Sequence, residues 1–189
     1  MKKFILFFAV ILTSGAVLLS AQAANNPALN TILNNFGARN YAAGAVTKTE
    51  LDLIIQAGLH APSANNRQPW HFTVVQNMDL AKKIIPQVTD GNVLIVVSAE
   101  GDGKTNGSVI LDCGLTVQSM YLAAQALGLG SRIYSGPMNT INSSLKSDLG
   151  MPASANAVAL VRVGRLPAGI DVASSASPRN SVDKVVTYK

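Results

Sequence analysis

The chain has 189 residues, 48% of them hydrophobic, and a formal net charge of +5, which together predict about one globular domain. The positive excess is mild and forms no basic run, so the composition excludes a typical nucleic-acid-binding protein. Cys113 is the single cysteine, which excludes an internal disulfide bond.

The N-terminal segment is predicted to be a targeting signal outside the folded domain. Lys2 and Lys3 precede an apolar run over 4–19, and an Ala-x-Ala site over 21–23 follows it. These features are typical of a secretory signal peptide (1–23), so we expect an exported protein, periplasmic or secreted, with its domain over 24–189. Loss of both lysines lowers the formal charge to +3. An uncleaved membrane anchor is the alternative, because the run is barely long enough to span a bilayer.

The rest of the chain alternates predicted helices and strands. A Thr-x-x-Glu capping box at Thr47 and Glu50 begins one helix, which ends before Pro62. The other expected elements, in chain order, are a helix over 27–36, a strand over 72–75, a helix over 80–85, a buried strand over 92–98, a long helix over 109–127, a strand over 131–134, a helix over 139–149 and a buried strand over 157–163. This mixture predicts an α+β or a three-layer α/β domain.

The most informative stretch is Ala61-Pro62-Ser63-Ala64-Asn65-Asn66-Arg67-Gln68-Pro69-Trp70-His71-Phe72. It combines a helix end, a polar loop bounded by two prolines and an aromatic strand. Such a loop could recognise a heterocycle or a phosphate through its amide and hydroxyl groups. On composition alone, a helix-to-strand connector whose Asn and Ser side chains cap backbone groups is the favoured interpretation.

The same stretch resembles the Ala-Pro-Ser-x-x-Asn-x-Gln-Pro-Trp signature of the nitroreductase family, FMN-dependent oxidoreductases that work as homodimers. Arg39-Asn40-Tyr41 resembles the end of the family's Arg-x-Ser-x-Arg/Lys-x-Phe/Tyr motif. Residues 123–130 look like the end of its long central helix, and Ser177-Pro178-Arg179 resembles its Lys-x-Arg phosphate contact. The resemblance covers nearly the whole chain after residue 23. It implies an α+β fold, a three-layer α/β/α sandwich with a mixed central sheet flanked by helices.

The resemblance also implies roles for individual residues. FMN carries the chemistry, so no catalytic side chain is expected, and Arg39 tunes the cofactor with a positive charge beside the flavin ring. Arg179 is implied to hold the phosphate. The other implied cofactor-binding residues are Ser63, Asn66 and Gln68, with some contacts reaching across the dimer, and Ser135 and Gly136 beside the isoalloxazine N5.

Three positions depart from the family pattern. Asn35 and Gly37 stand where the family has the arginine and serine of Arg-x-Ser, and Ser177 replaces the lysine of Lys-x-Arg. Each lost cationic phosphate contact is worth roughly 1.5–3 kcal/mol. Either other cations compensate, the candidates being Arg67, Arg132 and Lys184, or FMN binds loosely.

The resemblance implies a two-electron reduction of a small electron-poor acceptor, such as a nitroaromatic or a quinone, with the electron donor left open. The alternative is an exported binding protein that keeps the fold without catalytic turnover or without flavin. His60 and His71 lack partners at ligand spacing, so no metal site is expected. Cys113 is interpreted as a small buried residue within its helix rather than a redox thiol.

Overall fold

The computed structural model describes residues 26–100, 107–170 and 176–189. The expected signal peptide and its cleavage site lie outside these residues. The chain divides into a first unit that ends at Asn35 and a second unit over Phe36–Lys189. In the described part, no helix is both long and apolar enough to cross a membrane.

The described part of the first unit is dominated by helix α2 (Pro27–Leu33). Asn26 caps it, because its side-chain oxygen accepts hydrogen bonds from the backbone N–H groups of Ala28 and Leu29. A proline at the first helical position is compatible with this start, since the position needs no N–H donor. The helix ends three residues earlier than the apolar spacing predicts.

The second unit is built on a four-stranded sheet in the order β1-β2-β4-β3. All three neighbouring pairs are antiparallel, so the expected mixed sheet is wrong for the described strands. A parallel pair needs a crossover that returns the chain to the same end of the sheet, and no described connection between neighbouring strands makes one. The strands are β1 (Trp70–Val75), β2 (Val93–Glu100), β3 (Gly130–Tyr134) and β4 (Ala155–Gly164).

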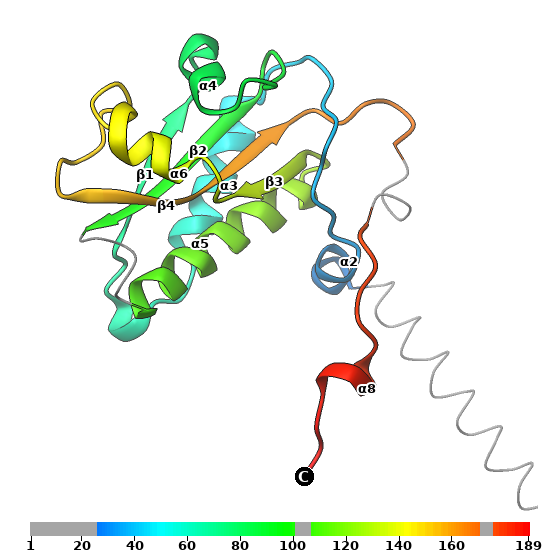
Figure 1. Cartoon of the computed structure of the whole chain (residues 1–189). Coiled ribbons are helices and arrows are strands. Elements are labelled where there is room, and N and C mark those ends of the chain that lie inside the picture. The colour runs from blue at the N-terminus through cyan, green and yellow to red at the C-terminus, as the bar shows by residue number, and fades with distance from the viewer. Residues whose placement is uncertain (1–25, 101–106, 171–175) are drawn as a thin grey trace, which may run out of the picture. The chain divides into compact units, whose positions relative to one another are not determined.

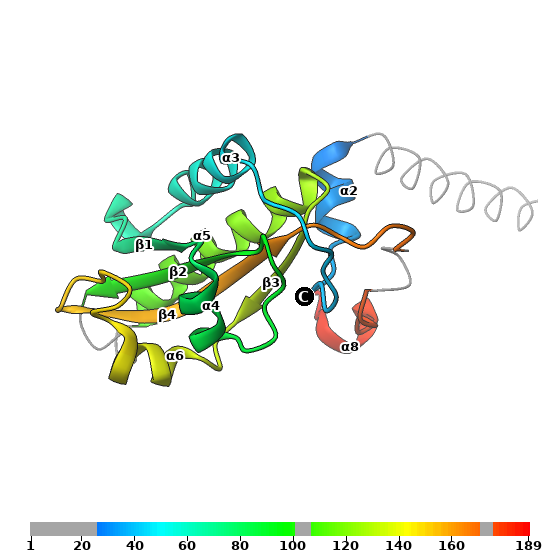
Figure 2. The same cartoon turned by 90° about the horizontal axis from the view of Figure 1, so that it is seen from above.

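Helices cover both faces of this sheet, which confirms the α+β class and its three layers (Figure 1, Figure 2). On one face, α3 (Lys48–Leu59) and α5 (Gly107–Ala126) pack on a core that includes Ile95 and Val161. On the other face, α4 (Met78–Ile84), α6 (Met138–Thr140) and a π-helical turn over Ile141–Leu145 pack on a core that includes Val96 and Leu160. Successive residues of β2 and β4 thus enter different cores, as the pleat requires.

The two central strands are mainly apolar on both faces because both faces are covered, although β4 also carries the buried Arg162. Every residue of β2 except Glu100 is buried, and the strands begin and end within two residues of the predicted bounds. The predicted helix over 139–149 is only partly right, since α6 gives way to the π-helical turn after three residues. Within that turn, the Asn142 amide bonds to both the N–H and the C=O of Ala157, beside the irregular register of β2 and β4.

The predicted capping box begins α3 as expected. Thr47 Oγ1 accepts from the Glu50 N–H, and the Glu50 carboxylate accepts from the Thr47 N–H. Glu50 also pairs with both terminal nitrogens of Arg165, which follows β4. This ion pair fastens the start of α3 to the end of the sheet. After the last strand, the only helix of the described tail is the short α8 (Val182–Val185).

Candidate functional site

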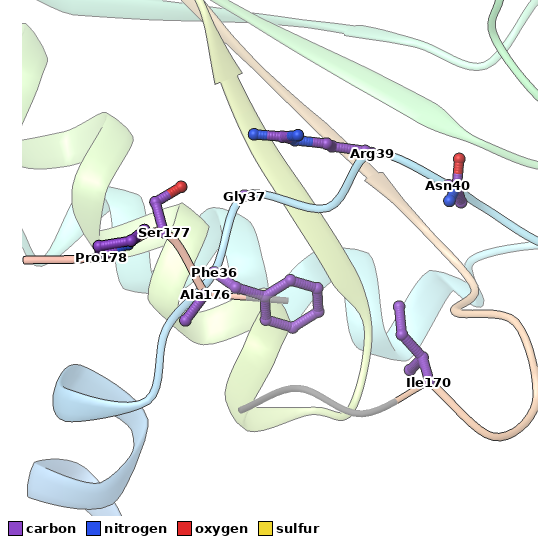
Figure 3. Close-up of a pocket in the computed structure, with 8 residues that line it drawn as sticks. All are labelled: Phe36, Gly37, Arg39, Asn40, Ile170, Ala176, Ser177 and Pro178. Atoms are coloured by element: carbon purple, nitrogen blue, oxygen red, sulfur yellow. The ribbon is translucent and has the colours of Figure 1, made fainter. Parts of the chain in front are cut away.

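The second unit contains a cavity of about 350 Å³ between two segments that are distant in the sequence (Figure 3). One segment is the start of this unit, and the other belongs to the C-terminal tail. The lining residues are Phe36, Gly37, Arg39 and Asn40 from the first segment, and Ile170, Ala176, Ser177 and Pro178 from the second. Arg39 and the Ser177-Pro178 pair, both expected at a cofactor site, therefore lie at one cavity.

Hydrogen bonds from α5 and β3 hold the first segment in place. The Gln125 side chain accepts from the Phe36 N–H and donates to the Phe36 carbonyl, each at 3.1 Å. The Ala38 N–H donates to the Ser131 carbonyl at 2.9 Å. The segment is therefore fixed between the C-terminal end of α5 and the first residues of β3, and Arg39 follows directly.

Arg39 is exposed, and its side chain extends over Gly37 toward the side of the cavity where Ser177 lies (Figure 3). Among the described residues, the ion pairs do not include Arg39. Arg179 follows the lining residue Pro178 directly and is also exposed. A cation free of a protein carboxylate at a solvent-accessible cavity can bind an anionic group of a ligand.

The polar loop after α3 has a strained backbone. Asn65, Asn66 and Gln68 have φ angles of 54°, 53° and 47°, in the left-handed region that residues other than glycine seldom adopt. Ser63 Oγ accepts from the Gln68 N–H at 3.0 Å, and the Gln68 amide donates to Asn66 Oδ1 at 3.1 Å. The three site residues predicted on this loop therefore contact one another. Backbone strain concentrated in such a loop is typical of a functional site.

A buried carboxylate of α5 holds this loop, and it lies outside the motifs that pointed to a site. Asp112 is 2% exposed and accepts from the Ala64 N–H at 3.0 Å and from Arg67 Nη2 at 3.4 Å. Arg67 Nη2 also donates to Ser108 Oγ, and Arg67 Nε donates to the Ala64 carbonyl. The sequence does contain a signal for this residue, because it is an aspartate within the apolar helical pattern over 109–127. A buried charge in such a helix requires a partner.

The predicted residues form separate groups in one chain. Asp112, which holds the loop, and Gln125, which holds the cavity segment, are separated on α5 by about 20 Å at 1.5 Å per residue. Ser135 and Gly136 are exposed and follow the end of β3 that is remote from Gly130, beside which Ala38 packs. Five residues of strand correspond to roughly 16 Å. Within one chain, Arg39 and Ser177 therefore lie at the same cavity, whereas the strained loop lies apart from both.

Two further expectations concern the Cys113 thiol and a metal site. Burial raises the pKa of the Cys113 thiol to about 11, so this group is a neutral thiol at physiological pH. In the part of the chain that the structure describes, no group of three or more His, Cys, Asp or Glu side chains could hold a metal ion.

Comparisons with known proteins assign the family. The model of the Nitroreductase family matches residues 38–100 and 86–165. A protein of Archaeoglobus fulgidus provisionally named NADH dehydrogenase/NAD(P)H nitroreductase is 30% identical over 146 residues, which are 72% of this chain and 83% of the relative. The chain therefore belongs to the nitroreductase family and is an oxidoreductase by that membership.

Solved structures agree with this assignment. A nitroreductase of Desulfovibrio desulfuricans, also provisionally named and crystallised in complex with FMN, has 27% sequence identity and a TM-score of 0.73. The match covers 87% of this chain and 98% of that structure. An FMN-bound nitroreductase of Bacteroides fragilis, at 22% identity and a TM-score of 0.71 over 87% of this chain and all of that one, shares the fold.

Proposed function

We propose that the protein is an FMN-dependent oxidoreductase that reduces a small electron-poor acceptor, such as a nitroaromatic compound or a quinone. When bound, FMN supplies reversible two-electron transfer between a donor and this acceptor. The main observation in support is the cavity that Arg39 and the Ser177-Pro178 pair both line, in a chain that belongs to the nitroreductase family. Relatives of the same fold are crystallised with FMN.

The residues around the cavity fit an anionic, phosphate-bearing ligand. Arg39 is exposed, extends over Gly37 (Figure 3) and pairs with no carboxylate among the described residues. Its planar guanidinium can donate two parallel hydrogen bonds to a phosphate or a ring carbonyl. Ser177 contributes a hydroxyl from the opposite segment, and Arg179 follows one residue after the last lining position. These groups would hold and orient the cofactor, and no side chain needs to act as a nucleophile.

The strained loop would contribute polar contacts to the flavin. Ser63, Asn66 and Gln68 are fixed by mutual hydrogen bonds before any ligand arrives. A fixed set of donors and acceptors loses little conformational entropy on binding, which favours affinity and a single orientation. The buried Asp112 of α5 supports this geometry, because it accepts a hydrogen bond from the Ala64 N–H of the loop.

A homodimer would unite these separate groups, with the cofactor site at the subunit boundary. The loop and the Arg39 cavity lie about 20 Å apart along α5 in one chain. A flavin at the cavity would therefore contact the loop residues of a second copy. Exposed apolar side chains on α3 and α5 are compatible with such a contact, because a subunit interface would remove them from water. They are Leu53, Leu59, Ile110 and Leu111.

The compartment follows from the proposed signal peptide over 1–23. We place the mature domain in the periplasm or outside the cell, where free nicotinamide cofactors are scarce. The electron donor would then be another exported carrier.

A second candidate is a binding protein that keeps the fold without flavin turnover. Ser177 favours it, since a hydroxyl at this lining position brings no charge to a phosphate. The absorption spectrum of the purified mature chain, before and after reconstitution with FMN, separates the two candidates. Flavin bands that stay with the protein through gel filtration support the oxidoreductase, and bleaching by a reductant followed by recovery with a quinone supports turnover. Colourless protein that takes up no FMN contradicts it.

A further inference from the structure

Two arginines on one face of the sheet adjoin the segment that carries Arg39, and they are the strongest feature that the proposed function leaves unassigned. Arg132 of β3 and Arg162 of β4 are partners in the antiparallel register, so their side chains emerge on the same face. A Cβ added to Gly37 would lie 3.8 Å from Arg132 Cγ, which places the Arg132 stem against the backbone that carries Arg39. The row therefore runs from β4 through β3 to the cavity segment.

The row becomes more accessible toward the cavity. Arg162 is 4% exposed, Arg132 is half-buried and Arg39 is exposed. Neutral groups satisfy the innermost arginine, whose Nε donates to Asn92 Oδ1 at 2.7 Å and whose Nη2 donates to Thr89 Oγ1 at 3.2 Å. The Arg162 guanidinium also donates to the Gln87 carbonyl and lies 4.0 Å from the centre of the Tyr41 ring. It is thus fixed in place without a counter-ion.

No carboxylate among the described residues forms an ion pair with any of the three arginines. Tyr41 does not supply the missing charge, because burial raises the pKa of its phenol above the usual value and keeps it neutral. The Arg132 guanidinium has a cation–π contact with the Tyr134 ring, at 5.3 Å from the ring centre. Three neighbouring cations without a protein anion make this face of the unit attractive to a ligand anion.

The sequence offers three cations that could replace the missing phosphate contact, and the structure places them differently. Arg67 is bound to Asp112 at the other end of α5, and Lys184 is an exposed residue of the short helix α8. Arg132 lies against Gly37, which lines the cavity. We propose that Arg132 is a cofactor-binding residue that supplies positive charge to the FMN phosphate, in place of the cation missing at Ser177, with Arg162 as the fixed charge behind it. This inference rests on the proposed function.

The test compares FMN with riboflavin, which has the same ring and ribityl chain but no phosphate. Flavin-free mature protein is titrated with each compound, and quenching of flavin fluorescence gives the dissociation constants. Arg132→Met keeps the aliphatic stem beside Gly37 and removes the charge, so it should weaken FMN binding about 10- to 100-fold, as expected for one charge-assisted hydrogen bond. Riboflavin binding should change less than about twofold, and Arg132→Lys should be intermediate because it keeps a charge without the planar fork.

Lys146→Ala is the matched control, because it removes one positive charge near the start of β4, the end of that strand remote from Arg162, where Lys146 bonds to the Ala153 carbonyl. It should leave both dissociation constants unchanged, and far-UV circular dichroism and thermal unfolding test whether each variant is folded. Unchanged FMN affinity in Arg132→Met overturns the inference, as does an equal loss of FMN and riboflavin affinity, which would indicate a packing role. Wild-type protein that binds neither flavin overturns the proposed function itself, and the inference with it.

Discussion

Replacing Asp112 with asparagine tests whether one buried carboxylate holds the strained loop. Asp112 accepts from the Ala64 N–H with one oxygen and from Arg67 with the other, and an asparagine side chain offers one acceptor and no charge. A hydrogen bond to a charged group contributes about 1.5–3 kcal/mol. The Arg67 side chain is 42% exposed, so water screens the ion pair and reduces its share. We therefore expect Asp112→Asn to lower the free energy of unfolding by about 1–2 kcal/mol.

The assay is urea unfolding followed by far-UV circular dichroism at pH 7, with the slope of the transition compared between proteins to exclude a change in the unfolded state. Asp52→Asn is the matched control, since it removes a carboxylate from an exposed pair with Lys48 and should cost less than about 0.5 kcal/mol. The loop should also bind flavin more weakly in Asp112→Asn, because its left-handed residues lose their support. A variant as stable as Asp52→Asn, with unchanged flavin affinity, would refute the reasoning.

Three further outcomes are expected. The bidentate Arg165 contact holds the pKa of Glu50 at about 2, so Glu50→Gln should cost about 1 kcal/mol at pH 7. Because the folded-state pKa is depressed, that difference should persist above pH 4.5 and disappear as the pH falls toward 2, which unfolding curves at several pH values measure. Leu111→Glu places a charge on the exposed apolar surface of α5 and should shift sedimentation toward monomer, whereas a flavin-bound wild-type monomer would contradict the dimer. Arg179→Ala should weaken FMN binding more than Arg39→Ala, and Arg39→Ala should lower the flavin reduction potential; equal affinities and unchanged potentials in a titration would contradict these assignments.

The elements that the sequence predicted well are those whose signal is local. The apolar runs that became β2 and β4 are buried on both faces, and the capping box at Thr47 and Glu50 is formed as expected. The strand directions were missed because pairing depends on residues far apart in the chain. The expected mixed sheet came from the resemblance, and the described strands pair only antiparallel.

The site shows the same division between local and distant signals. The loop residues Ser63 and Gln68 were identified by a contiguous motif and do contact each other. The support that Gln125 gives to Phe36 joins residues 89 positions apart, and no local pattern indicates it. The three-arginine row likewise depends on the register of β3 against β4, so the sequence could name Arg132 only as one of three candidates.

The cavity also determines when the proposed cofactor can be loaded. Its lining comes from residues near 39 and near 177, so it exists only after most of the chain has folded. The proposed signal lacks twin arginines and is typical of export as an unfolded chain, which cannot retain a noncovalent ligand whose site has not formed.

We expect FMN to be captured after export, so flavin content of the exported protein should rise when FMN is added outside the cell. A version expressed without residues 1–23 should instead acquire flavin in the cytoplasm regardless of external FMN. Flavin content measured by absorbance on protein from each compartment decides between these outcomes, and exported protein that is fully loaded without external FMN would contradict the prediction.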